Sequence, residues 1–199
     1  MEKSAIWVID DFINLDYQER IKNMLMGEME YKDELFSWYY QRDITDGYDE
    51  NSQGRAGLSH VYVEYDEDTG TSEITSEFHE VFLPLLRHAC HTLKIQNAEV
   101  LQGRSFLQFP LNIKNKEDDT PHVDLERDGF FVVLYYVCDA DGDTVIYNEK
   151  EKSDKYTINQ TVTPKQGRVV LFDGSIYHTA QQTTDRVRCL VNYNLALVR

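Results

Sequence analysis

The apolar residues in the second half of the chain fall into short runs that Gly, Pro, Asn and Asp separate. These runs predict strands at residues 101–109, 129–138, 144–147, 156–162, 168–172 and 187–197. Because turns rather than helices connect the runs, we expect an antiparallel sandwich or barrel. In the last run Val187, Cys189, Val191 and Tyr193 share one apolar face, and the opposite face carries Arg188 among amides.

The first half of the chain shows a different pattern. Residues 5–9 form a short apolar run that predicts a strand. Asp16 and Glu19, spaced as in a capping box, predict a helix that ends near Met26. Apolar residues then recur at helical spacing over residues 72–93, which predicts an amphipathic helix that covers a sheet.

Acidic residues concentrate in one segment. Residues 43–77 contain ten Asp or Glu and one basic residue, Arg55. Four glycines in this segment interrupt regular structure, so the pattern predicts a long surface loop. The loop is either a solvated surface or a lid over a site, and a lid of this charge would suit a cationic partner.

Composition narrows the class of protein. The 199 residues suit one domain, in which residues 1–99 would support a β core of residues 100–199. A net charge of -15 disfavours nucleic acid and anionic membranes as partners. The sequence has no apolar run long enough to cross a bilayer and no secretory signal at its start, which predicts a cytoplasmic protein. Cys90, Cys138 and Cys189 are expected to be thiols in apolar surroundings.

Two histidines in the second half of the chain have informative neighbours. His122 and Asp124 are two residues apart, so on an extended backbone both side chains face the same side and can bind one cation. His178 follows a predicted hairpin that can bring its imidazole beside them. Two imidazoles and one carboxylate occupy one face of a metal ion, which suits a non-haem Fe(II) and also zinc with a bound water.

Arg188 favours iron over zinc. It lies on the polar face of the last predicted strand, where a cation that points into a barrel needs an anion. A guanidinium suits the distal carboxylate of a small dicarboxylate whose other end chelates the metal, and a zinc hydrolase has no need of one. Arg186 competes for this role, and an ion pair of Arg188 with Asp173 or Asp185 is the structural alternative.

The order and spacing of these motifs resemble the Fe(II)- and 2-oxoglutarate-dependent oxygenases, in particular their prolyl-4-hydroxylase-like branch. The matching segments are 6–12, 122–124, 134–137, 141–145, 167–172, His178 and 188–194. The resemblance implies a mainly β fold with flanking helices (α+β), built on a double-stranded β-helix core of the jelly-roll or cupin type.

The same resemblance assigns roles to individual residues. His122, Asp124 and His178 would bind Fe(II), and Arg188 would pair with the C5 carboxylate of 2-oxoglutarate. Tyr136 is the expected hydroxyl partner of that carboxylate, and its neighbour Tyr135 is the alternative. Leu190 stands where the family often has a small hydroxyl residue, so Asn192 or Tyr136 would supply that hydrogen bond.

The resemblance also implies an activity. Such an enzyme uses Fe(II), 2-oxoglutarate and O2, with ascorbate as a possible reductant, to hydroxylate an unactivated C–H bond. A prolyl residue in a peptide or protein is the first expected substrate, and a free amino acid or another small metabolite is the alternative. Asp124 occupies the position where halogenating relatives have a small residue, which favours hydroxylation. A cupin-like module that binds a metal or dicarboxylate without catalysis is the non-enzymatic alternative.

Overall fold

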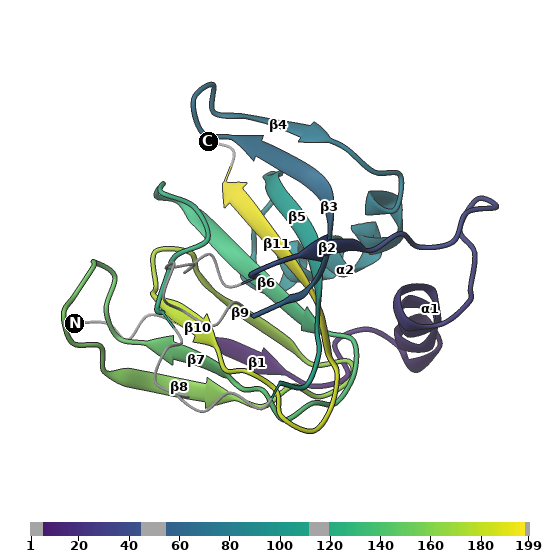
Figure 1. Cartoon of the computed structure of the whole chain (residues 1–199). Helices are drawn as coiled ribbons and strands as arrows, with labels where there is room; N and C mark the ends of the chain where they lie inside the picture. Colours follow the sequence, from purple (N-terminus) through teal and green to yellow (C-terminus); the bar gives the residue numbers. More distant parts are fainter. Residues whose placement is uncertain (1–5, 45–54, 112–119, 198–199) are drawn as a thin grey trace.

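A computed structural model describes residues 6–44, 55–111 and 120–197. Two antiparallel sheets form most of the fold (Figure 1). The larger sheet has eight strands in the order β1-β9-β6-β11-β5-β3-β2, and β4 also pairs with β3. These strands are β1 (Trp7–Ile9), β2 (Tyr39–Gln41), β3 (Gly57–Asp66), β4 (Thr71–Ile74), β5 (Ala98–Gln108), β6 (Phe130–Tyr136), β9 (Val169–Asp173) and β11 (Arg188–Leu197).

The smaller sheet faces the middle of the larger one. Its order is β10-β7-β8, with β7 (Thr144–Tyr147) in the centre between β10 (His178–Ala180) and β8 (Ile158–Val162). An apolar core that includes Val132, Ile146 and Phe172 fills the space between the two sheets. The prediction of a mainly β fold with flanking helices is confirmed.

Two helices lie against the outer face of the larger sheet (Figure 1). They are α1 (Leu15–Met26) and α2 (His79–Leu93). Ile21 and Phe82 from these helices share a second core with Val191 and Tyr193 of β11. The alternation in β11 thus sends its apolar face to the helices and its other face, with Arg188, to the space between the sheets.

The predicted helix over residues 72–93 is seven residues too long at its start. Thr71–Ile74 instead form β4, which pairs with β3 in a hairpin. Gly70 adopts a positive φ of 69°, and the Asp66 carboxylate accepts hydrogen bonds from the backbone of Asp68 and Thr69, so a tight turn forms here. The side chain of Ile74 is consequently 63% exposed and does not belong to the apolar face of α2.

This hairpin also corrects the prediction of a long acidic loop. The second part of the segment 43–77 belongs to the larger sheet as β3 and β4. Residues 45–54, part of the segment for which a lid was one of two alternatives, lie outside the described residues. Ile44, just before them, lines the pocket between the sheets.

The N-terminus of α1 also differs in detail from its prediction. Asn14, not Asp16, is the N-cap, and its side-chain oxygen accepts a hydrogen bond from the Tyr17 backbone at 2.9 Å. The helix therefore begins at Leu15, and it ends at Met26 as predicted.

The first 99 residues contribute strands as well as helices. β1 pairs with β9, and β3 pairs with β5, so the larger sheet draws on both halves of the chain. Cys90, Cys138 and Cys189 are free thiols. Within the described ranges, no helix has the length and apolar character needed to cross a membrane, and a cytoplasmic location stays a prediction.

Candidate active site

A pair of backbone hydrogen bonds joins the two histidines that the sequence singled out. The amide of His122 donates to the carbonyl of His178, and the amide of His178 donates to that of His122, both at 2.9 Å. In such an antiparallel pair the two side chains lie on the same side, and their ring centroids are 4.7 Å apart. With Asp124, they form a cluster whose potential ligand atoms all lie within 4.8 Å of one another.

Asp124 is held from two strands. Its Oδ1 accepts a hydrogen bond from Nη2 of Arg104 at 3.2 Å, and its Oδ2 accepts one from Nδ2 of Asn192 at 3.0 Å. Arg104 in β5 and Asn192 in β11 are register partners, which is why both reach the same carboxylate. Burial would raise the pKa of Asp124, but the nearby His178 imidazole and Arg104 guanidinium hold this pKa at about 2. The carboxylate is therefore ionised at neutral pH.

His178 is prepared to act as a neutral ligand. Burial lowers its pKa to about 4, so the imidazole is uncharged at neutral pH. Its Nδ1 lies 3.2 Å from the carbonyl oxygen of Ile176, and this contact places the proton on Nδ1 because a carbonyl only accepts. The free Nε2 then points at Oδ1 of Asp124, 3.8 Å away. His122 has a similar contact, with its Nδ1 3.3 Å from the carbonyl of Thr120.

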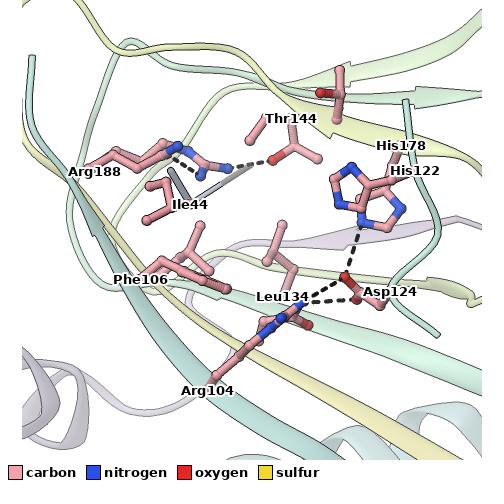
Figure 2. Close-up of a pocket in the computed structure, with 14 residues that line it drawn as sticks. Ile44, Arg104, Phe106, His122, Asp124, Leu134, Thr144, His178 and Arg188 are labelled. Atoms are coloured by element: carbon pink, nitrogen blue, oxygen red, sulfur yellow. Dashed lines mark hydrogen bonds and ion pairs between the residues drawn. The ribbon is translucent and has the colours of Figure 1, made fainter. Parts of the chain in front are cut away.

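Arg188 lies at the other end of the same pocket (Figure 2). It is 2% exposed, and its Nη1 and Nη2 donate to Oε1 of Gln108 at 2.7 Å and Oγ1 of Thr144 at 2.8 Å. Its Nε is buried and has no hydrogen-bond partner in the described part of the chain. A buried guanidinium whose hydrogen-bond partners are all neutral favours the binding of an anion.

The alternatives to a carboxylate-binding role for Arg188 were a role for Arg186 and an ion pair of Arg188 with Asp173 or Asp185. The side chain of Arg186 is 63% exposed and lies beside Asp185, whose carboxylate is 3.9 Å from its Nε. Asp173, the other proposed ion-pair partner, binds Lys150. Arg188 is thus the arginine of this strand that reaches the pocket, and it forms an ion pair with neither of these aspartates.

The sequence matches no family model and no curated protein. The fold, in contrast, resembles solved structures of one class of enzyme. A 2OG-Fe(II) oxygenase family oxidoreductase from Burkholderia pseudomallei has a TM-score of 0.65 and 12% identity, covering 99% of this chain and 86% of that one. HygX from Streptomyces hygroscopicus, with nickel, 2-oxoglutarate and hygromycin B bound, has a TM-score of 0.56 and 12% identity, covering 98% and 84%. The viral collagen prolyl hydroxylase vCPH from Paramecium Bursaria Chlorella virus-1, in a complex with 2OG, has a TM-score of 0.52 and 12% identity, covering 98% and 96%.

The chain has the fold of the 2OG-Fe(II) oxygenases. The double-stranded β-helix expected from the sequence motifs is therefore confirmed. The larger and smaller sheets are the two walls of this oxygenase fold, and the pocket with the His-Asp-His cluster lies between them. The pocket encloses about 590 Å³ of space between the atoms, open solvent at its mouth included.

The structure separates the two tyrosines within this oxygenase fold. Tyr136 faces the space between the sheets, whereas Tyr135 packs on the helix side. The Tyr136 hydroxyl, however, donates to Oγ1 of Thr144 at 2.7 Å, and its ring lies 5.7 Å from the guanidinium carbon of Arg188. Thr144 lines the pocket and Tyr136 does not. The structure therefore places Thr144 on the cavity with the Tyr136 hydroxyl bound to it, and a direct contact of Tyr136 with the carboxylate stays a prediction.

Asn192 lines the pocket but belongs to the Asp124 end. Its side-chain amide donates to Asp124, four residues along β11 from Arg188. Four residues of strand span roughly 13 Å, so Asn192 is too far away to supply a hydrogen bond beside Arg188. It orients the carboxylate of the cluster instead.

Sequence reasoning missed three residues of this oxygenase pocket. Gln108 and Thr144 hold the Arg188 guanidinium, and Arg104 contacts Asp124. Arg104 and Gln108 share the inward face of β5, since they are four residues apart in one strand. The alternation along this strand could have indicated that Arg104 and Gln108 face inward. It could not indicate which residues they contact, because those contacts depend on strand register, which one sequence does not specify.

Proposed function

We propose that this protein is an Fe(II)- and 2-oxoglutarate-dependent dioxygenase that hydroxylates an unactivated C–H bond. The observation that carries the proposal is the combination, in one pocket, of a His-Asp-His cluster with a buried arginine that lacks a carboxylate partner. The neighbour HygX is described with nickel and 2-oxoglutarate bound, and this pairing of ligands fits the two ends of the pocket.

The donor set fits iron. His122, Asp124 and His178 would hold Fe(II) on one face and leave the opposite face open for other ligands. When bound, iron, 2-oxoglutarate and O2 supply the oxidation: one oxygen atom enters the substrate C–H bond, and the other enters succinate as CO2 leaves. Asp124 supplies the carboxylate ligand, which favours hydroxylation over halogenation.

The other end of the pocket fits the distal carboxylate of 2-oxoglutarate. Arg188 would bind the C5 carboxylate through its guanidinium, and the hydroxyl of Thr144 would share in this contact. Gln108 and Tyr136 fix Arg188 and Thr144 in place, so the anion site is formed before the ligand arrives. Apolar residues between the two ends, including Leu134 and Leu190, exclude water from the reacting atoms.

Two substrate classes fit this chemistry, and both are represented among the structural neighbours. One neighbour is described as a collagen prolyl hydroxylase, which supports a prolyl residue in a peptide or protein. Another is described with hygromycin B bound, which supports a small molecule such as a free amino acid or other metabolite. The net charge of -15 argues against a nucleic acid in either case.

Succinate release tests the proposal. Purified protein with Fe(II), ascorbate, 2-oxoglutarate and O2 should form succinate slowly even without substrate. The Asp124→Ala variant should lose this turnover, and Asp154→Ala, which removes an exposed carboxylate, should retain it. Metal and 2-oxoglutarate binding without O2-dependent succinate would indicate a binding module, and a hydrolytic activity that persists without O2 would indicate a zinc enzyme.

A further inference from the structure

A second arginine lies in the pocket and has no role in holding 2-oxoglutarate. Arg104 faces the cavity from β5, four residues from Gln108, which contacts Arg188. Four strand residues span roughly 13 Å, so the two arginines mark opposite ends of the pocket. Figure 2 shows Arg104 reaching Asp124 from below, while Arg188 lies at the left, opposite the two histidines.

The Arg104 side chain is held by two contacts, but not all of its N–H donors have an acceptor. Its guanidinium carbon lies 4.9 Å from the ring centre of Phe106, and its Nη2 donates to Oδ1 of Asp124. An arginine has several N–H donors, and Nε of Arg104 is buried without a hydrogen-bond partner in the residues that the structure describes. A buried donor without an acceptor is costly, so this position favours a ligand that accepts hydrogen bonds.

The charge of the pocket favours an anionic ligand. Among the described lining residues, Arg104 and Arg188 are cationic and Asp124 is the one carboxylate. A divalent metal and a dicarboxylate cancel each other's charge, and histidines that bind a metal are neutral. The loaded pocket therefore keeps a net positive charge, although the whole chain has a net charge of -15.

We propose that Arg104 binds a carboxylate of the substrate, and that the substrate is a small carboxylic acid such as a free amino acid. This inference rests on the proposed function and chooses between its two substrate classes. An internal prolyl residue of a peptide has no carboxylate near its ring, so it would leave the net positive charge of the loaded pocket without an anion.

The position of Arg104 also limits where the substrate reacts. The Asp124 oxygen that accepts from Arg104 is the same oxygen that lies 3.8 Å from Nε2 of His178. A carboxylate bound to Arg104 thus lies next to the metal ligands. The hydroxylated carbon is then only a few bonds from that carboxylate, roughly two to four at ordinary bond lengths.

Ligand NMR on protein loaded with Mn(II) and N-oxalylglycine, an unreactive analogue of 2-oxoglutarate, tests this inference without turnover. Mn(II) broadens the proton signals of any molecule that binds beside it. The probes are the common L-amino acids at millimolar concentration and, as matched controls, their carboxamides. At least one acid should broaden, and its amide should not.

Variants then assign the effect to Arg104. Arg104→Met keeps an apolar stem on Phe106 and removes the charge, so the acid should bind roughly 10- to 100-fold more weakly. Arg104→Lys should restore part of the affinity because it keeps the charge. Arg127→Met is the control, since Arg127 makes a similar contact with the Tyr65 ring and does not line the pocket. Its affinity for the acid should equal that of the wild type.

The outcomes separate this inference from the proposed function. Binding of Mn(II) and N-oxalylglycine without broadening of any acid overturns the role of Arg104 and leaves the proposed function intact. Equal broadening of an acid in wild type and Arg104→Met also overturns the role of Arg104 in substrate binding. A loss of Mn(II) binding in Arg104→Met overturns that role too, because Arg104 would then be a positioning residue for Asp124. A wild-type protein that binds no Mn(II) refutes the proposed function itself, together with this inference.

Discussion

The two ends of the pocket are built in different ways. At the Arg188 end, all the contacting side chains lie on regular strands: Gln108 is the register partner of Arg188, and Thr144 belongs to the facing sheet. At the other end, His122 and Asp124 lie outside the named strands, and a single two-residue bridge joins His122 to His178. Regular strands therefore form the proposed anion site, whereas the proposed metal site depends on one backbone bridge and a few side chains.

The two ends also differ in their electrostatics. Arg188 remains charged at any pH at which the protein folds, even though burial lowers its pKa. The metal end contains His178, whose neutral form burial favours. The comparison predicts that the two ends respond separately to mutation and that the metal end alone responds to mild acid.

The largest expected effect separates the two ends directly. Arg188→Met removes the guanidinium that would pair with the C5 carboxylate, so 2-oxoglutarate should bind roughly 100-fold more weakly to the Mn(II)-loaded protein. Mn(II) affinity should change little, because the metal cluster is at the opposite end. Calorimetric titration of each ligand measures both values, and Arg186→Met, at an exposed position, is the control. Equal losses of both affinities would show that Arg188 has a structural role.

A smaller effect concerns mild acid. In the unfolded chain His178 takes up a proton near its ordinary pKa of 6.5, whereas in the folded protein this pKa is about 4. The unfolded state therefore binds more protons between these values, and the free energy of unfolding should fall by about 2 kcal/mol from pH 7 to pH 5 on account of this group.

Urea denaturation of the metal-free protein at both pH values measures this change. The His178→Gln variant should lose that part of the pH dependence, and His91→Gln, at an exposed helix position, should keep it. An identical pH dependence in wild type and His178→Gln would contradict the assignment of the effect to His178.

A third prediction tests whether the hydrogen bond from Asn192 to Asp124 contributes to metal binding. Asn192→Ala removes one of the two hydrogen bonds to Asp124 and leaves Arg104 in place. Mn(II) should bind roughly tenfold more weakly, which is the usual effect of losing a group that orients a metal ligand. Asn194→Ala is the matched control two residues further along β11, where the side chain contacts Gln102 instead. A similar loss in both variants would point to a general weakening of the strand.

The sequence predicted what depends on local periodicity. Alternation along residues 188–194 placed Arg188 and Asn192 on one face, and the spacing of His122 and Asp124 placed them side by side, because a strand repeats every two residues. It did not specify the bridge between His122 and His178, which joins residues 56 positions apart. Motif resemblance supplied that contact.

The errors came from features that periodicity does not contain. Ile74 fits the apolar spacing of α2, but a turn at Gly70 places it in the β3–β4 hairpin instead. Strand alternation placed Tyr135 and Tyr136 on opposite faces of the sheet, as observed. It gave no information on whether the Tyr136 hydroxyl reaches the cavity. Thr144 accepts from the tyrosine hydroxyl and lines the cavity, and it comes from the facing sheet, whose approach is set by tertiary packing.

The smallest predicted effect, that of Tyr136→Phe, tests whether Tyr136 or Thr144 contacts the ligand. Thr144→Val removes the hydroxyl that accepts from both Arg188 and Tyr136. Because this hydroxyl would form one hydrogen bond to a charged group, 2-oxoglutarate should bind roughly tenfold more weakly. Tyr136→Phe removes only a supporting hydroxyl and should weaken binding about two- to threefold, within the range of one neutral hydrogen bond. Titration of 2-oxoglutarate into both Mn(II)-loaded variants gives the ranking. If Tyr136→Phe has the larger effect, the tyrosine hydroxyl contacts the ligand directly, and the anion site closes around 2-oxoglutarate rather than being formed in advance by the strands.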